Sequence, residues 1–147
     1  MKLLYLIITI CNAITIRIDK DFTKREHNII NSAIDSWNAV EQFITVDDTS
    51  INSIVKGYDR HQLGYTTKYI YPTYEVITIT IVTNRIPHRN TLYNVVLHEL
   101  GHALGLKHNN DPRSIMNSSI MVGIDRRALN TPMFALGLFD MCSVNYN

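Results

Sequence analysis

The sequence predicts a single α+β domain, and three features of the chain support this prediction. The 147 residues, 46% of them hydrophobic and 18% charged, are enough for one domain with a sizeable core. A helix-capping signal near the N-terminus precedes a helical repeat of apolar residues. A β-rich stretch over residues 44–83 then separates this first helix from a second helical segment.

Residues 1–13 have the pattern of a secretory leader. Lys2 supplies the positive charge, Leu3–Cys11 form a short apolar run, and Ala13 offers a cleavage site. A membrane-spanning helix needs about 20 apolar residues, and this run is much shorter. We expect a signal peptide over 1–13 and one domain over 14–147, with a buried N-terminal strand and an uncut membrane anchor as the alternatives.

The first helix is expected over Lys24–Phe43, after a strand over Ile14–Asp19. Thr23 and Glu26 form a capping box, in which a hydroxyl and a carboxylate three residues apart satisfy the first backbone N–H groups. Apolar residues then recur every three or four positions, which gives the helix one buried face. Trp37 lies on that face, and we expect it to anchor the core.

Three strands are expected after this helix, over Ser53–Tyr58, Gly64–Tyr71 and Glu75–Val82. The third strand has β-branched residues at most positions, which is typical of a buried strand. Pro72 ends the second, because proline lacks the N–H that a ladder needs.

A second helix is expected from Asn90, a good N-cap, to Gly105, which can end it in a left-handed conformation. Residues 111–123 are irregular. A last helix is expected over Thr131–Cys142, with Pro132 at its first turn.

The charge balance excludes some classes of partner. Lys and Arg number 14 and Asp and Glu 13, so the net charge is +1. Such a chain offers no strong positive field for nucleic acid. We expect no nucleic-acid partner, no stable membrane insertion once the leader is removed, and a monomer by default.

The segment from 98 to 108 has the pattern H-E-x-x-H-x-x-G-x-x-H. His98 and His102 are about 400° apart around a helix and about 6 Å along it, so both imidazoles leave the same face. Glu99 can then reach a water beside them. Gly105 allows a sharp turn that brings His108 back as a third ligand. Three imidazoles with an open fourth position are typical of a catalytic zinc site.

This pattern resembles the signature of the metzincin metallopeptidases. Asp111–Met116, which places Met116 eight residues after His108, resembles the connection into the Met-turn of the matrixins, the matrix-metalloproteinase type. The resemblance implies a mixed, mostly parallel, twisted sheet with an antiparallel edge strand. It also implies a long first helix, an active-site helix, a Met-turn and a C-terminal helix. Met116 would then lie beneath the metal as a hydrophobic floor.

The chain departs from the matrixin pattern at several positions. Asn109 stands where matrixins usually have serine, and residues 117–120 lack the Tyr-Pro wall of the specificity pocket. The region that holds a structural zinc and calcium in matrixins is much shortened, with Asp59 and His61 as its remnants. We therefore expect no second zinc, and the sequence gives calcium no support.

The resemblance implies a secreted, extracellular zinc-dependent endopeptidase of the matrixin type. As a further departure from the family, we expect the domain to have no prodomain. One catalytic zinc would be held by His98, His102 and His108, with Glu99 as general base for peptide-bond hydrolysis. A peptide or protein substrate would lie against an edge strand within Leu63–Ile70. The stretch over residues 117–130 would shape the S1′ pocket, with Ile120, Val122 and Ile124 as its apolar lining. The alternative is a catalytically silent zinc-binding module that captures peptides or inhibitors.

Overall fold

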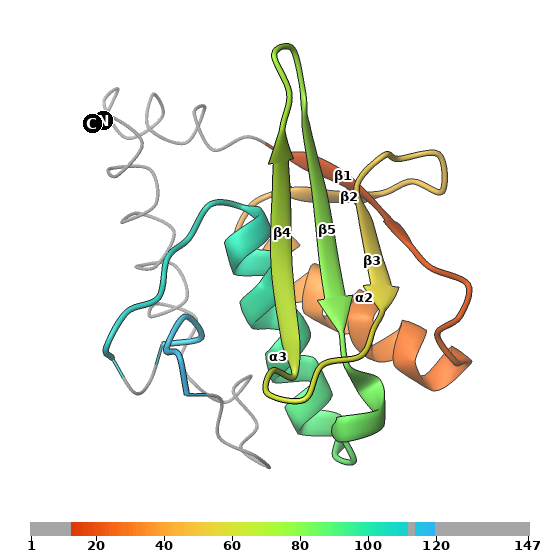
Figure 1. Ribbon diagram of the computed structural model, residues 1–147, viewed down its shortest axis with the longest axis vertical. Helices are drawn as coiled ribbons and strands as arrows, with labels where there is room; N and C mark the ends of the chain where they lie inside the picture. Colours follow the sequence, from red (N-terminus) through yellow and green to blue (C-terminus); the bar gives the residue numbers. More distant parts are fainter. Residues whose placement is uncertain (1–12, 112–113, 120–147) are drawn as a thin grey trace.

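A computed structural model describes residues 13–111 and 114–119, which form a twisted sheet with two long helices packed against one face (Figure 1). The predicted last helix over Thr131–Cys142, and all but the final residue of the predicted leader, lie outside the described residues. None of the described helices has the length and hydropathy that a bilayer span requires.

The sheet has five strands in the order β2-β1-β3-β5-β4. β1 (Ile14–Ile18), β2 (Ile44–Val46), β3 (Ser53–Lys56) and β5 (Glu75–Ile81) run parallel to one another. β4 (Gly64–Ile70) is one of the two edge strands and pairs with β5 in the antiparallel direction. The expected α+β fold, with a mostly parallel sheet and one antiparallel edge strand, is thereby confirmed.

The first helix, α2 (Lys24–Asn38), begins with the expected capping box. The Thr23 hydroxyl accepts the Glu26 N–H at 3.3 Å, and the Glu26 carboxylate accepts the Thr23 N–H at 2.7 Å. Both groups satisfy backbone donors that have no partner inside the helix.

The predicted end of this helix at Phe43 is wrong, because α2 ends five residues earlier at Asn38. The Asn38 side-chain oxygen accepts the N–H groups of Phe43 and Ile44 at 3.1 and 2.9 Å, and its amide donates to the Ile44 carbonyl at 2.8 Å. These bonds tie the helix end to the start of β2. The helix therefore ends before the repeat of apolar residues does.

The second helix, α3 (Arg89–Ala103), begins two residues earlier than expected, with His88 and not Asn90 as the N-cap. His88 is extended, and its carbonyl accepts the Leu92 N–H at 3.0 Å, which starts the helical ladder. A short 3-10 turn, η1 (Thr83–Arg85), connects β5 to this helix. The chain turns away just after α3 at Gly105, whose positive φ of 103° matches the expected left-handed conformation.

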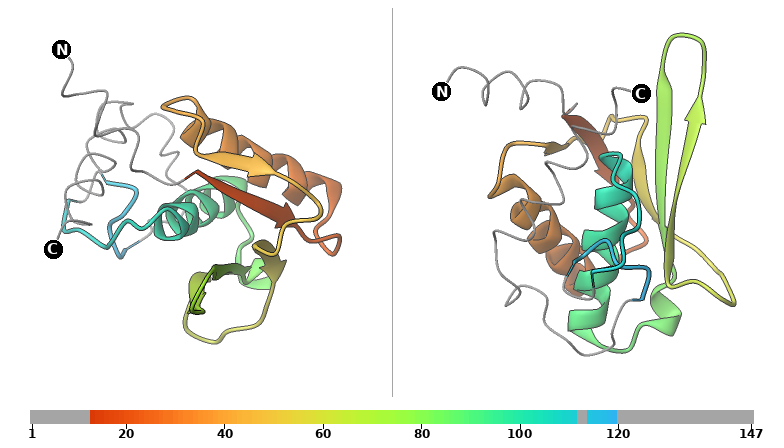
Figure 2. Two further views of the ribbon diagram at one scale, coloured as in Figure 1. Left: turned by 90° about the horizontal axis from the view of Figure 1, so that it is seen from above. Right: turned by 90° about the vertical axis from the view of Figure 1, so that its left-hand side faces the viewer.

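Trp37 joins the two helices in the core, as expected. Its side chain is fully buried, and its indole N–H donates to the Leu97 carbonyl of α3 at 3.0 Å. The α3 helix passes between α2 and the β4–β5 side of the sheet, as the two views of Figure 2 show. Most of α3 is therefore buried, and its histidines lie on a framework with little freedom to move.

Candidate metal centre

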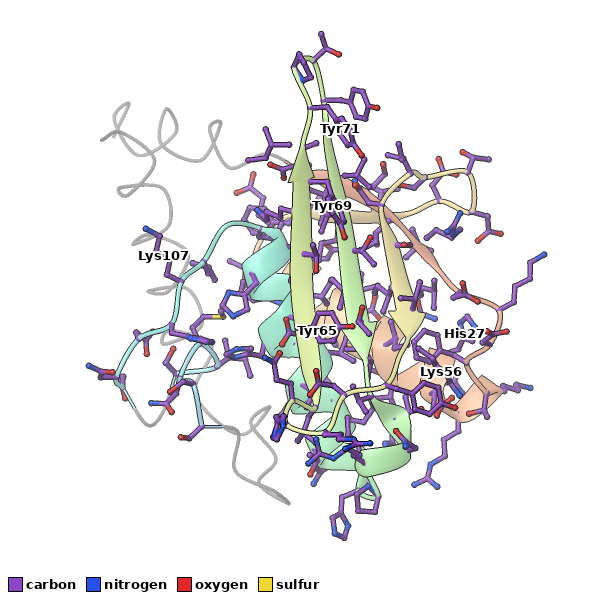
Figure 3. The ribbon with its side chains drawn as sticks, in the orientation of Figure 1. His27, Lys56, Tyr65, Tyr69, Tyr71 and Lys107 are labelled. Atoms are coloured by element: carbon purple, nitrogen blue, oxygen red, sulfur yellow. The ribbon has the colours of Figure 1, made fainter. Side chains whose placement is uncertain are left out.

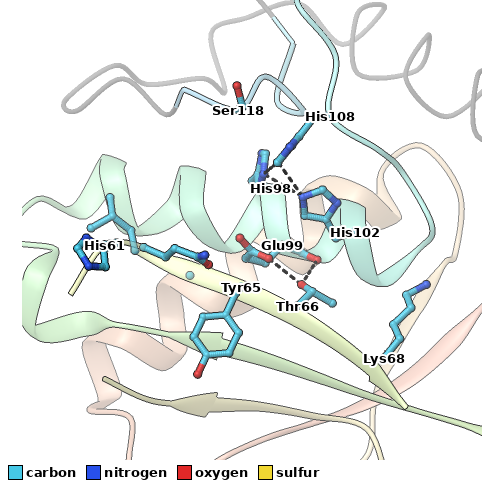
Figure 4. Close-up of a pocket in the computed structure, with 12 residues that line it drawn as sticks. His61, Tyr65, Thr66, Lys68, His98, Glu99, His102, His108 and Ser118 are labelled. Atoms are coloured by element: carbon cyan, nitrogen blue, oxygen red, sulfur yellow. Dashed lines mark hydrogen bonds between the residues drawn. The ribbon is translucent and has the colours of Figure 1, made fainter. Parts of the chain in front are cut away.

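Three histidine side chains meet at one end of the cleft between β4 and α3. His98 and His102 come from α3, and His108 comes from the segment that follows Gly105 (Figure 4). The Nε2 atom of His98 lies 3.0 Å from that of His108 and 3.1 Å from that of His102, and the His102 and His108 atoms are 3.1 Å apart. The three nitrogen atoms thus form a nearly equilateral triangle.

Backbone carbonyls fix which ring nitrogen of two of these histidines carries the proton. The His98 Nδ1–H donates to the Ile115 carbonyl at 2.7 Å, and the His102 Nδ1–H donates to the Leu106 carbonyl at 2.8 Å. A carbonyl can only accept, so a neutral ring must carry its proton on Nδ1 and keep a lone pair on Nε2. Two lone pairs directed at a common point repel each other unless a cation lies between them.

The donor set fits a zinc ion. Tetrahedral zinc with Zn–N bonds of about 2.0–2.1 Å needs ligand nitrogens about 3.3–3.4 Å apart. The observed separations of 3.0–3.1 Å come within a few tenths of an ångström of that value. Neutral imidazoles are also ligands that zinc prefers, and three of them leave a fourth position open.

Glu99 lies next to the triad and is a buried residue, only 4% exposed. The Thr66 hydroxyl of β4 contacts its carboxylate, with Oγ1 and Oε2 2.7 Å apart. Burial raises the pKa of Glu99, although the Thr66 hydrogen bond and the nearby His108 oppose the shift. A carboxylate with a raised pKa is better matched to proton transfer near neutral pH.

Gly64 allows β4 to lie close against α3 at this point. A Cβ on Gly64 would come within 2.8 Å of a Val95 methyl carbon and 3.1 Å of the Glu99 Cγ atom. Any side chain there would push the edge strand away from the helix. The close approach is what lets Thr66, two residues further along β4, reach the Glu99 carboxylate.

Met116 is fully buried beside α3, in the turn over residues 114–117. A Cβ on Gly101 would clash with its sulfur, so the glycine leaves the space that this side chain fills. The Met116 carbonyl accepts the Asn109 N–H at 3.0 Å. The Ser114 hydroxyl accepts both the Met116 N–H and the Asn109 side-chain amide, at 3.0 and 2.8 Å. These bonds hold the turn next to the third histidine.

A cleft of ≈ 670 Å³ opens over the triad and Glu99. One wall is β4, which contributes Thr66 and Lys68, and Ser118 lies on the other side (Figure 4). His61, treated above as a remnant of a shortened metal region, also lines the cleft. Of the stretch expected to shape the S1′ pocket, residues 120–130 lie outside the described part of the chain.

Two contributors to this site were not singled out in the sequence. Thr66 could have been found from strand alternation, because residues 64, 66 and 68 share one face of β4. Ser114 carries no such signal, since its role depends on how the turn folds back on Asn109. Asn109 was noted only as a departure from the matrixin pattern.

The fold and the triad define a metzincin-type zinc metalloprotease domain, and comparison with known proteins agrees. The matrixin family model matches residues 14–131. Over 27 residues the chain is 67% identical to the probable matrix metalloproteinase 095L of Invertebrate iridescent virus 3 and to human and rat matrix metalloproteinase-16. This stretch is 18% of the chain, 7% of the viral protein and 4% of the mammalian proteins.

The chain belongs to the matrixin family, since the family model covers most of its length. At the level of the family, matrixins are zinc metalloproteases. The matched stretch spans only a small part of each relative.

Proposed function

We propose that this protein is an endopeptidase that hydrolyses internal peptide bonds with one zinc ion. His98, His102 and His108 hold the ion, and Glu99 is the general base. The observation that carries the proposal is the position of the Glu99 carboxylate, buried beside three converging Nε2 atoms in an open cleft. A binding-only module would have no use for a desolvated carboxylate there, so this position favours the enzyme over the silent alternative.

When bound, zinc supplies a Lewis acid that lowers the pKa of water to about 7 and polarises carbonyl oxygens. Glu99 takes a proton from the attacking water as the new C–O bond forms, and it returns that proton to the amine nitrogen as the C–N bond breaks. Thr66 keeps one carboxylate oxygen in place, which leaves the other for proton transfer. One water is consumed, and a carboxylic acid and an amine are released.

The proposed substrate is an extended polypeptide that lies antiparallel to β4. The outer edge of β4 has no neighbouring strand in the described sheet, so its backbone can accept one. Such a peptide would cross the cleft between Thr66 and Ser118, over the triad. We assign Met116 the role of a packed floor that supports the ligands and does not bind the metal.

A glutamine in place of Glu99 tests the proposal. Glu99→Gln keeps the size of the side chain but removes the base, so turnover should fall about 10²–10⁴-fold while bound zinc stays at one ion per chain. Both are measured on the same refolded protein, zinc by elemental analysis and turnover by mass spectrometry of an unbiased peptide library. The library also shows whether the cleaved bonds are internal.

Glu41→Gln is the matched control, because Glu41 is exposed and far from the cleft along the chain. It should cleave the library like the unmodified protein, and a chelator should stop this cleavage. Undiminished turnover in Glu99→Gln would refute the assignment of the base. Zinc-loaded protein that cleaves nothing would favour the silent module.

We also propose that residues 1–13 act as a secretory leader and that the protein works outside the cell. The charge on Lys2 and the short apolar run after it support this proposal. N-terminal sequencing of protein recovered from culture medium should begin at Ile14. Protein retained in the cell with Met1 intact would contradict it.

A further inference from the structure

The hairpin formed by β4 and β5 extends beyond the rest of the described sheet. Figures 1 and 2 show its tip clear of the other described elements. The tip is a tight turn through Pro72 and Thr73, closed by a hydrogen bond of 2.9 Å from the Tyr71 N–H to the Tyr74 carbonyl. The two tyrosine rings that flank the turn stack, with centroids 4.6 Å apart.

Large apolar side chains collect on this hairpin. In the described residues seven large hydrophobic side chains are exposed, and four of them lie here. They are Tyr69, Ile70, Tyr71 and Tyr74, with Ile70 the most open at 81% exposed. Single exposed hydrophobic residues scattered over a surface are normal, whereas a cluster of them is typical of a binding surface.

The cluster carries no net charge. The charged residues Lys68 and Glu75 stand at its base and pair with each other at 3.8 Å. A partner would therefore meet apolar and aromatic surface and not a charge, which points to apolar and aromatic side chains on the partner.

The free edge of β4 joins this cluster to the catalytic cleft. Thr66 and Lys68 line the cleft, and Ile70 follows on the same face of the strand two residues later. Tyr69 and Tyr71 follow on the opposite face, where Figure 3 shows them along the strand and its end. A peptide strand added to this edge would place its own side chains beside both sets.

We propose that this hairpin cluster, Tyr69 to Tyr71 with Tyr74, binds the part of a polypeptide substrate that lies N-terminal to the cleaved bond. The inference rests on the proposed function, in which the substrate runs antiparallel to β4. Its N-terminal side then points toward Ile70, and about five residues of extended chain, roughly 17 Å, separate the level of Thr66 from that of Tyr71. Substrates with apolar or aromatic residues about five positions before the cleaved bond are preferred.

Peptides of different length test this surface. A core peptide that the zinc-loaded protein cleaves is extended at its N-terminus by about four apolar and aromatic residues. In one control peptide the added residues are Gly and Ser, and in another the apolar residues are added at the C-terminus. We expect the apolar N-terminal extension to raise kcat/KM about tenfold through KM, and both controls to raise it little.

Two variants locate the effect. Ile70→Ser with Tyr71→Ser removes exposed apolar surface, and the ratio of kcat/KM between extended and core peptide should fall to about one. Tyr58→Ser is the matched control, because Tyr58 is 89% exposed outside the hairpin, and it should keep the tenfold ratio. Binding of the extended peptide to zinc-loaded Glu99→Gln, measured by fluorescence anisotropy, should show the same order without any cleavage.

The outcomes separate the two proposals. If the core peptide is cleaved but the N-terminal extension gives no gain, or the gain survives in the double variant, the hairpin surface is refuted and the peptidase stands. If no peptide is cleaved, the proposed function fails and the hairpin proposal with it. A dimer that dissociates in the double variant, with no gain from the extension, would make the hairpin a self-association surface and overturn the proposal.

Discussion

At the residue scale, the contact between Thr66 and Glu99 fixes the position of the carboxylate that we propose as the general base. The Glu99 carboxylate is buried, so it depends on protein groups for the hydrogen bonds that water would otherwise supply. The Thr66 hydroxyl supplies one of them at 2.7 Å and also lies 3.0 Å from the Glu99 backbone carbonyl. A single side chain of the edge strand therefore orients the carboxylate with respect to the three histidines.

Replacing this threonine by valine should slow catalysis without emptying the site. Thr66→Val keeps the shape and removes the hydroxyl, so the carboxylate loses a bond worth about 1.5–3 kcal/mol to a charged group. We expect kcat to fall about 10- to 100-fold, with KM and zinc content close to those of the unmodified protein. Steady-state kinetics and elemental analysis on one preparation give all three quantities.

Thr67→Val is the control, because Thr67 is the next residue on β4 and faces the other side of the sheet. It changes the same atoms in the same strand and should leave kcat unchanged. An equal loss in both variants would mean that the strand was disturbed and would refute the positioning role of Thr66.

The core of the candidate site could be predicted from local sequence, and its surroundings could not. Helical geometry alone places His98, Glu99 and His102 near one another, because residues up to four positions apart in a helix lie within about one turn. Thr66 is 33 residues away from Glu99, and its contact depends on Gly64 letting β4 approach α3. Contacts of that kind depend on how strands and helices pack, which no local pattern encodes.

At the element scale, the start of α2 illustrates how local signals and tertiary contacts combine. The capping box was visible in the sequence, and the structure adds an ion pair in which Lys56 of β3 lies 2.8 Å from the Glu26 carboxylate. Burial alone would raise the pKa of Glu26, but the bonds from Lys56 and Thr23 outweigh it and lower the pKa. One carboxylate thus caps the helix and joins it to the sheet.

This ion pair predicts how stability depends on pH. The pKa of Glu26 is lower in the folded than in the unfolded chain, so its contribution is present above the unfolded pKa of about 4.3 and is lost as the pH falls through the folded pKa. Glu26→Gln retains an oxygen for the Thr23 N–H but loses the charge. We expect it to be less stable by about 1 kcal/mol at pH 7 and equal to the unmodified protein in strong acid.

Urea unfolding at several pH values measures this difference. Glu41→Gln removes an exposed carboxylate near the other end of α2 and should show no such dependence. A difference between Glu26→Gln and the unmodified protein that stayed constant down to strongly acidic pH would contradict the ion-pair explanation.

The boundaries of elements were harder to predict than their existence. Four of the five strands and both helices were expected close to where they occur, because period and capping are local properties. The three-residue strand β2 was not expected. The end of α2 was not, since the Asn38 side chain forms a turn with Phe43 and Ile44 that no helix rule contains. Likewise Asn90 is a good cap by residue type, but the connection from β5 makes His88 the residue that enters the helix.

At the scale of the whole molecule, the histidine triad connects the helix α3 with the segment that follows Gly105. His98 and His102 belong to the buried helix α3, whereas His108 belongs to the exposed segment after Gly105. The His98 Nδ1 bond to Ile115 and the Asn109 bond to Met116 attach the rest of that segment to the core. A metal ion at the triad would therefore hold the C-terminal half of the site onto the sheet and helix framework.

Removal of zinc should accordingly lower thermal stability. A ligand present at about 1,000 times its Kd stabilises the folded state by about 4 kcal/mol, which for a chain of this size corresponds to a Tm difference of about 10 °C. We expect chelation to lower the Tm by that amount and added zinc to restore it. His102→Ala should lose the zinc-dependent shift and His88→Ala, at an exposed histidine outside the triad, should keep it. Identical Tm values with and without the chelator would show that the triad does not couple metal binding to folding.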